Sequence, residues 1–197
     1  MHTFRRLLAV GAATVTVAGV ATGGAGASPG GAIYHGGAFT ATSPVKHTFT
    51  FAGAYTFECS SPSATGTGGF AGVSLTVSLS GCKYLAFPAT VTTSGPWDFP
   101  LVTNLGGGRY ANRLSWPSGT TTTISVPIAG CTIVIPGGQI ISHGVAGAVL
   151  VSENKTGGVE MTNHVTGIAF TASGCPFSSG VYGEYEGRFF LPGVAIY

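Results

Sequence analysis

Hydrophobic and polar residues alternate along several segments of this chain. The clearest segment is 73–80, Val-Ser-Leu-Thr-Val-Ser-Leu-Ser, in which apolar and hydroxyl residues alternate without interruption. Most odd positions between 49 and 59 are aromatic or apolar, and threonines occupy several of the even positions. A period of two residues is typical of a strand with one face in the core and the other in water.

Comparable β-patterned runs occur at 86–93, 120–128, 132–135, 145–152, 165–172 and 181–191, and Gly- and Pro-rich turn signals separate them. No apolar set recurs with helical spacing over more than about one turn. We therefore predict an all-β fold, a disulfide-stapled antiparallel β-sandwich or barrel-like single domain over residues 45–197. Residues 28–44, rich in Gly, Ala and Ser, are expected to form a flexible lead-in.

The N-terminus has the pattern of an export signal. Arg5 and Arg6 precede an apolar stretch over 7–21, and Ala25-Gly26-Ala27 supplies a small-x-small cleavage site. The stretch is shorter than the roughly 20 residues that span a bilayer. We predict a signal peptide over 1–27 with cleavage before Ser28, a secreted, extracellular or wall-associated protein, and no transmembrane helix after processing.

Four cysteines lie in the exported part of the chain, and an oxidising compartment favours their pairing. Of the three pairings that four cysteines allow, Cys59–Cys82 and Cys131–Cys175 are preferred, because each pair brackets one strand-rich segment. Zinc is the alternative role for four cysteines, but the chain has no C-x-x-C and no H-x-x-x-H motif. We expect no metal and no cofactor.

The full chain carries a formal net charge of +2, which falls to zero once Arg5 and Arg6 are removed with the signal. The remaining charged residues are Lys46, Lys83, Arg109, Arg113, Lys155 and Arg188 against Glu58, Asp98, Glu153, Glu160, Glu184 and Glu186. Nucleic-acid binding needs clustered Lys and Arg, so a nucleic-acid partner is excluded. The composition instead predicts a surface of Ser, Thr and Gly, or a protein packed against something.

The spaced cysteines and glycines form a recognisable whole. The segments Thr56-Phe57-Glu58-Cys59, Ser80-Gly81-Cys82 and Ser173-Gly174-Cys175, together with the run 92–97 and the export signal, resemble a group of uncharacterised secreted four-cysteine proteins abundant in actinobacteria. The resemblance implies a secreted β domain. It carries over no catalytic residue.

Catalytic groups are few and scattered. Glu184 and Glu186 share one strand face with Arg188, which is expected to pair with Glu186, and Asp98 is the one aspartate. Two carboxylates about 7 Å apart could in principle form a glycosidase pair. No nucleophile motif accompanies the histidines. We therefore expect that the protein is not an enzyme.

Three functions remain open. The leading hypothesis is a structural or interaction module whose partner is a cell-wall glycan or another envelope protein. The first alternative is a carbohydrate-binding module that presents Trp97, Tyr110 and Trp116 to sugar rings. The second alternative is an envelope β-barrel pore, against which stand prolines within or beside the strand candidates.

Overall fold

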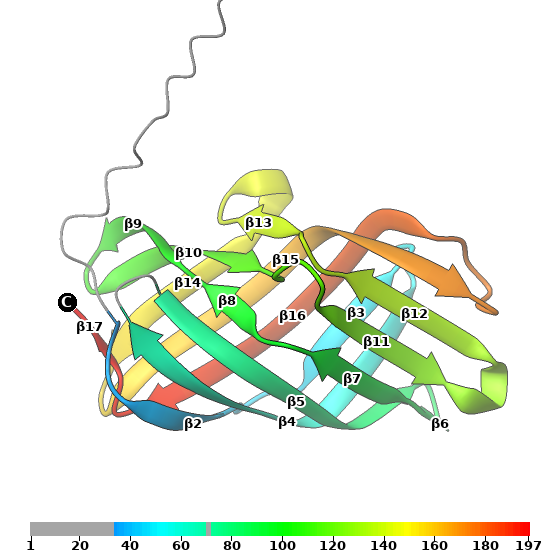
Figure 1. Ribbon diagram of the computed structural model, residues 1–197, viewed down its shortest axis with the longest axis horizontal. Coiled ribbons are helices and arrows are strands. Elements are labelled where there is room, and N and C mark those ends of the chain that lie inside the picture. The colour runs from blue at the N-terminus through cyan, green and yellow to red at the C-terminus, as the bar shows by residue number, and fades with distance from the viewer. Residues whose placement is uncertain (1–33, 70–71) are drawn as a thin grey trace, which may run out of the picture.

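The computed structural model describes residues 34–69 and 72–197, and β-strands make up most of it (Figure 1). The predicted signal peptide lies outside the described residues. The strands are β1 (Tyr34–His35), β2 (Ala38–Thr42), β3 (His47–Phe51), β4 (Tyr55–Gly69), β5 (Gly72–Tyr84), β6 (Phe87–Pro88), β7 (Thr90–Ser94), β8 (Trp97–Phe99), β9 (Leu101–Gly106), β10 (Arg109–Ser115), β11 (Thr121–Val126), β12 (Cys131–Pro136), β13 (Ile140–Ser142), β14 (Val149–Lys155), β15 (Gly158–Ser173), β16 (Gly180–Pro192) and β17 (Ala195–Ile196). Two 3₁₀ turns, η1 (Pro127–Ala129) and η2 (Val145–Gly147), complete the described elements. The predicted all-β class is confirmed.

The antiparallel pairings close into a ring. Its order is β16-β3-β4-β5-β8-β10-β14-β15, and β15 pairs again with β16. Strands β12, β11 and β7 continue the sheet from the C-terminal part of β15. They return to the ring at β5, where the Thr93 hydroxyl donates to the Val77 carbonyl at 2.8 Å. Of the two predicted architectures, the molecule has the barrel-like one.

The core fills the interior of this ring. Residues 73–80 of β5 alternate strictly between buried apolar side chains and more exposed hydroxyl side chains, as predicted. Aromatic side chains from neighbouring strands meet inside: Phe49 lies 5.0 Å from Tyr185 and 6.5 Å from Trp97, measured between ring centroids. Edge-to-face and offset arrangements of this kind are the favourable ones for aromatic pairs. The outward positions are therefore left to Ser, Thr and charged residues.

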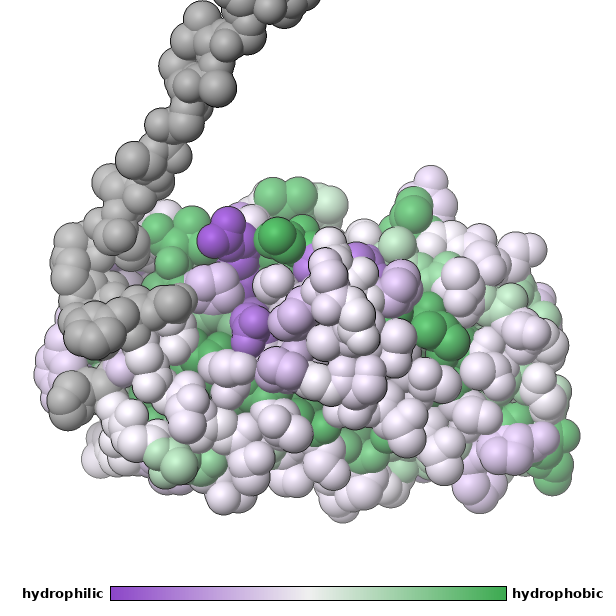
Figure 2. Space-filling view, in the orientation of Figure 1, coloured by the Kyte–Doolittle hydropathy of each residue, from purple (hydrophilic) through white to green (hydrophobic). Residues whose placement is uncertain are grey.

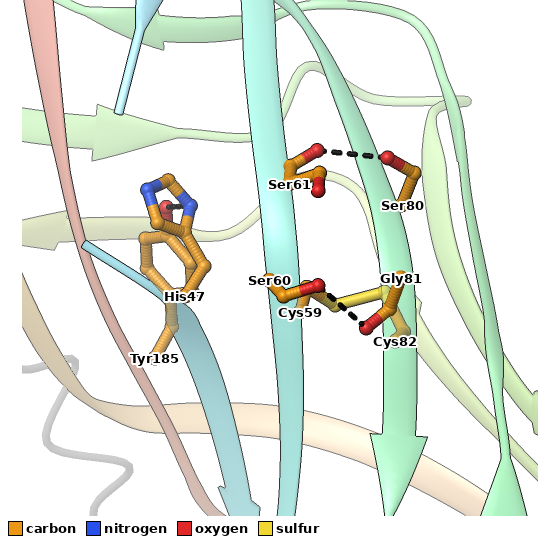
Figure 3. Close-up of a disulfide and its surroundings, with 8 residues drawn as sticks. All are labelled: His47, Cys59, Ser60, Ser61, Ser80, Gly81, Cys82 and Tyr185. Atoms are coloured by element: carbon orange, nitrogen blue, oxygen red, sulfur yellow. Dashed lines mark hydrogen bonds between the residues drawn. A yellow bond between two sulfur atoms is a disulfide. The ribbon is translucent and has the colours of Figure 1, made fainter. Parts of the chain in front are cut away.

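Both predicted disulfides are present, Cys59–Cys82 and Cys131–Cys175. Cys59 of β4 lies directly opposite Cys82 of β5, so the first bridge staples two adjacent strands (Figure 3). The hydroxyls of Ser60 and Ser80 donate across the same pair of strands, to the carbonyls of Gly81 and Ser61. Each bridge contributes about 3–4 kcal/mol of stability in the chain-entropy model.

The folded part of the chain begins earlier than predicted. Within the expected lead-in 28–44, residues 34–35 and 38–42 form β1 and β2, while residues 28–33 lie outside the described part. Tyr34 is buried, and its hydroxyl lies 2.5 Å from the Ser152 hydroxyl, which also accepts from the Asn112 amide at 2.7 Å. The structure differs from the prediction because these partners come from β10 and β14, far away in sequence.

Two predicted strands also begin or end differently. The expected run 145–152 begins with η2, because the backbone is left-handed at Gly144 and Gly147, with φ of 80° and 83°. The expected run 120–128 ends at Val126, since Pro127 opens η1. A left-handed residue interrupts the regular extended backbone, and a Pro has no N–H to donate to a neighbouring strand.

A buried histidine on β3 forms hydrogen bonds with the neighbouring strand β16. His47 is fully buried, its Nδ1 lies 2.9 Å from Tyr185 Oη, and the Arg188 backbone N–H donates to its Nε2 at 3.2 Å. Burial lowers the pKa of His47 to about 4, although a hydrogen bond from Nε2 of the protonated ring to the Arg188 carbonyl oxygen, 3.1 Å away, acts in the opposite direction. Gly187 makes room for this pair, because a Cβ there would lie 2.6 Å from Tyr185 Oη and 2.8 Å from the imidazole ring.

We predict that Gly187→Ala destabilises the fold by about 1–3 kcal/mol, the usual cost of overpacking a core. Urea unfolding monitored by tryptophan fluorescence measures the change. Gly37→Ala is the matched control, since no atom lies within 4 Å of a Cβ at Gly37. Equal unfolding midpoints for the two variants would contradict the packing assigned to Gly187.

We also predict that acid weakens the fold through His47. Its pKa is about 4 in the folded state against 6.5 in the unfolded chain, so only the unfolded chain takes up the proton between these values. The stability that His47 contributes is complete above pH 6.5 and falls by on the order of 3 kcal/mol as the pH drops to about 4. His47→Gln should flatten this part of the curve of unfolding free energy against pH, and an unchanged slope would refute the assignment.

Candidate functional site

The aromatic residues expected to face a sugar ligand lie in the core instead. Trp97 and Trp116 are each 1% exposed and contact each other edge to face at 5.6 Å, and Tyr110 is 7% exposed. The prediction of ligand-facing aromatics is wrong for these three residues. Trp97 and Phe99 flank Asp98 on β8, so the two-residue period turns both rings inward and the carboxylate outward. The alternation Trp-Asp-Phe was the signal that could have shown this.

The three candidate carboxylates do not come together. Glu184 and Glu186 are exposed on β16, whereas Asp98 lies on β8. Counted along the ring in either direction, three strands separate β8 from β16, so the two strands lie on opposite sides of the fold. Arg188 pairs with Glu160 at 3.7 Å, so the expected pair with Glu186 is not formed. Glu160 stands diagonally across from Arg188 on the paired strand β15, within reach of its long side chain.

The outer surface of β2, β4, β5, β8 and the end of β10 carries an ordered set of hydroxyl groups. Strand register places Thr40, Thr65 and Thr76 in one row across three strands. We call the whole set the hydroxyl face, and it consists of Thr40, Thr42, Ser63, Thr65, Thr67, Ser74, Thr76, Ser78, Asp98 and Ser115, all exposed or half-buried. Rows of this kind arise because every second residue of each strand points outward and the strands are paired in register.

The spacing of the rows follows from strand geometry. Neighbouring strands lie about 4.8 Å apart, and alternate residues of one strand lie about 6.7 Å apart. The next row contains Thr67 opposite Ser74 and continues through Asp98, which pairs with Ser74 on one side and with Ser115 on the other. A partner that lies on this surface therefore meets a regular array of groups that both donate and accept hydrogen bonds.

Asp98 occupies a groove within the hydroxyl face. Its Oδ1 accepts a 2.7 Å hydrogen bond from Ser74 Oγ, which orients the carboxylate at the groove wall. Glycine backbone forms part of the lining and includes Gly72. A side chain is excluded at Gly72, because its φ is 134° and a Cβ there would lie 2.5 Å from the Phe99 carbonyl oxygen. A second depression continues over β2, where the half-buried Phe39 and Pro96 add apolar surface. The grooves thus combine hydroxyls, one carboxylate and small apolar patches.

Hydroxyl rows also cross β7, β11, β12 and β15. Thr90, Ser125, Thr132 and Ser173 lie opposite one another in register, and all are exposed or half-buried. Strands β2, β4, β5, β7 and β11 lie on the side toward the viewer in Figure 1. Figure 2 shows that much of this side has the pale colours of weakly polar residues, with little strong purple. The hydroxyl face therefore belongs to a broader, weakly charged side of the molecule.

Residues 34–69 and 72–197 contain no group of three or more His, Cys, Asp or Glu side chains placed to hold a metal ion. Over the same residues, no helix has the length and hydrophobicity to cross a membrane. In comparisons with protein-family models, curated proteins and solved structures, nothing matches this chain.

Proposed function

We propose that the protein is an extracellular interaction module of the cell envelope, and that its hydroxyl face binds a neutral polymer rich in hydroxyl groups, such as a cell-wall glycan. The observation that carries this proposal is the register of the Thr and Ser rows beside a single carboxylate, Asp98. Hydroxyl groups can donate to and accept from sugar hydroxyls, and a carboxylate accepts strongly from them. A charged ligand has no matching cluster of opposite charge on this face.

Several features support the extracellular setting. One disulfide joins β4 to β5, the other joins β12 to the connection after β15, and such bridges persist in oxidising compartments. The export pattern at residues 1–27 and the resemblance to secreted four-cysteine proteins of actinobacteria agree with it. We propose secretion on these grounds, with retention at the wall through the bound glycan.

We further propose that the protein binds without catalysis. Acid–base chemistry on a glycosidic bond requires two carboxyl groups about 5–10 Å apart. Asp98 and the Glu184–Glu186 pair stand on opposite sides of the ring, and Glu184 and Glu186 are adjacent outward residues on an exposed strand face. The interior is filled by aromatic side chains including Trp97 and Tyr185, so we do not favour the alternative of a pore.

The binding proposal predicts that the double variant Thr65→Ala/Thr76→Ala binds envelope glycan about tenfold more weakly. Each lost hydrogen bond is worth about 0.5–1.5 kcal/mol, and the two hydroxyls are neighbours in one row. Co-sedimentation of the secreted protein with purified, insoluble wall glycan provides the dissociation constant.

The matched control is Thr50→Ala/Thr56→Ala. These threonines also lie opposite each other, on β3 and β4 with their hydroxyls 3.0 Å apart, but outside the hydroxyl face. The control should bind like the wild type. Equal weakening in both double variants, or no binding by the wild type, would show that the hydroxyl face is not a glycan site.

The non-catalytic proposal predicts no turnover on a panel of glycans and esters. Asp98→Asn, Glu184→Gln and Glu186→Gln should therefore leave the product level at background, as measured by reducing-end and acid release. Turnover by the wild type that one of these substitutions lowers by about a hundredfold, the loss typical of an acid–base residue, would identify an enzyme.

A further inference from the structure

Four chain connections meet at one end of the molecule, at the right in Figure 1. They are residues 52–54 between β3 and β4, 85–86 between β5 and β6, 127–130 between β11 and β12, and 174–179 between β15 and β16. Register and contacts place them together. Thr90 pairs with Ser125, so the segments before β7 and after β11 share an end. The disulfide from Cys131, which directly follows the connection 127–130, to Cys175 joins that end to the connection 174–179. We call these four connections the disulfide end.

Large apolar side chains protrude from the disulfide end. Leu85 is 70% exposed and Ile128 is 74% exposed, while Phe87 beside them is 43% exposed. Hydrophobic colouring is visible at the lower right of the surface in Figure 2. Single exposed apolar residues are common on proteins, but several gathered on the tips of neighbouring loops form a patch that marks an interaction site.

The backbone at Leu85 strengthens this interpretation. Leu85 has a φ of 53°, in the left-handed region, within the tight turn between Tyr84 and Phe87. Gly, Asn and Asp adopt this conformation readily, whereas a bulky apolar residue there is strained. Residues with a strained backbone cluster at functional sites of proteins. The turn holds a large apolar side chain in solvent where a small polar residue would be more stable.

Aromatic residues lie immediately behind the tips. Tyr55, Tyr84 and Phe177 are half-buried, with ring centroids of Tyr55 and Phe177 4.4 Å apart and those of Tyr55 and Tyr84 6.2 Å apart. They line a small depression together with Val126, Ala129 and Pro176. Tyrosines with an apolar body and a polar hydroxyl are enriched where an apolar phase meets water.

Charged residues begin one layer further from the tips. The four connections contain no Asp, Glu, Lys or Arg. Lys83 precedes Tyr84 and lies opposite Glu58, which Lys46 contacts at 3.1 Å. Lys83 is two positions before Leu85 along the strand, a distance of about 7 Å. The order from the tip inward is thus aliphatic, aromatic and then charged.

We propose that the disulfide end inserts its apolar loop tips into the surface of a lipid layer. The order of side chains matches the order of environments at such a surface, since acyl chains lie deepest, aromatic residues favour the interface and charged groups stay at the headgroups. This inference is independent of the glycan proposal, because it involves the end of the molecule and not the hydroxyl face.

The test uses the mature protein with phosphatidylcholine vesicles in a flotation assay. We expect the wild type to float with the vesicles and to do so equally in low and high salt, because the tips are uncharged. Leu85→Asn and Ile128→Ser should each lower the partition coefficient about tenfold, the effect of withdrawing one aliphatic side chain from an apolar phase.

Leu85→Asn also separates binding from folding. Asn suits the left-handed turn, so this variant should unfold at the same or a higher urea concentration than the wild type while it floats less. Ile140→Ser is the matched control: Ile140 is 62% exposed on β13, outside the disulfide end, and its loss should leave flotation unchanged.

Three outcomes would overturn the proposal. The wild type could fail to float, or Ile140→Ser could weaken flotation as much as Ile128→Ser. The third is that sedimentation velocity shows a wild-type dimer, lost in Leu85→Asn, with no flotation of either protein, which would make the partner a second copy of the chain. Wall-glycan binding by the Thr65→Ala/Thr76→Ala variant tests the other proposal separately.

Discussion

The rest of the structure depends on the register in which β3, β4 and β5 pair. His47, Cys59 and Cys82 lie opposite one another in a single row, and the disulfide between the two cysteines holds that row together. A slip by one residue would turn every side chain of a strand to its other face. Phe49 and Phe57 would then face water, and the threonines between them would face the core. The buried contacts of His47 with Tyr185 and Arg188 connect the same row to β16 and so to the closure of the ring.

This register determines which side chains lie inside the ring of strands and which lie on its outer surface. Inside, it assembles an aromatic core that leaves few buried polar groups, with the Tyr34–Ser152–Asn112 cluster among the exceptions. Outside, it aligns serines and threonines across strands into the hydroxyl face. The same alternation therefore produces the stability of the fold and the surface that we propose as its binding site. The low charge of the chain suits a partner recognised through hydrogen bonds, without ionic attraction.

The two proposed contacts occupy different parts of the molecule and rest on different physics. The hydroxyl face lies on the outer surface of the ring of strands and has regularly spaced hydrogen-bonding groups, whose rows follow strand register. The disulfide end consists of turns whose apolar tips depend on local backbone, as at Leu85. A protein with both surfaces could bridge a glycan layer and a lipid layer.

The sequence by itself predicted the all-β class, most of the strands and the preferred disulfide pairs, because alternation over a few residues and the position of a cysteine within a strand-rich segment are local properties. The alternation Trp-Asp-Phe also places Asp98 on the opposite strand face from Trp97, and this signal outweighs the prediction that Trp97 lies on the surface. Only the tertiary structure decided which strands are neighbours. Packing between distant segments brings Tyr34 of the expected lead-in against Ser152 in the core, and the ring separates Asp98 from Glu184. The pairing of β2, β4 and β5 aligns Thr40 with Thr65 and Thr76. Such rows depend on pairing between residues far apart in the chain, and the free energy of that pairing comes from the packed interior as a whole, which no single segment encodes.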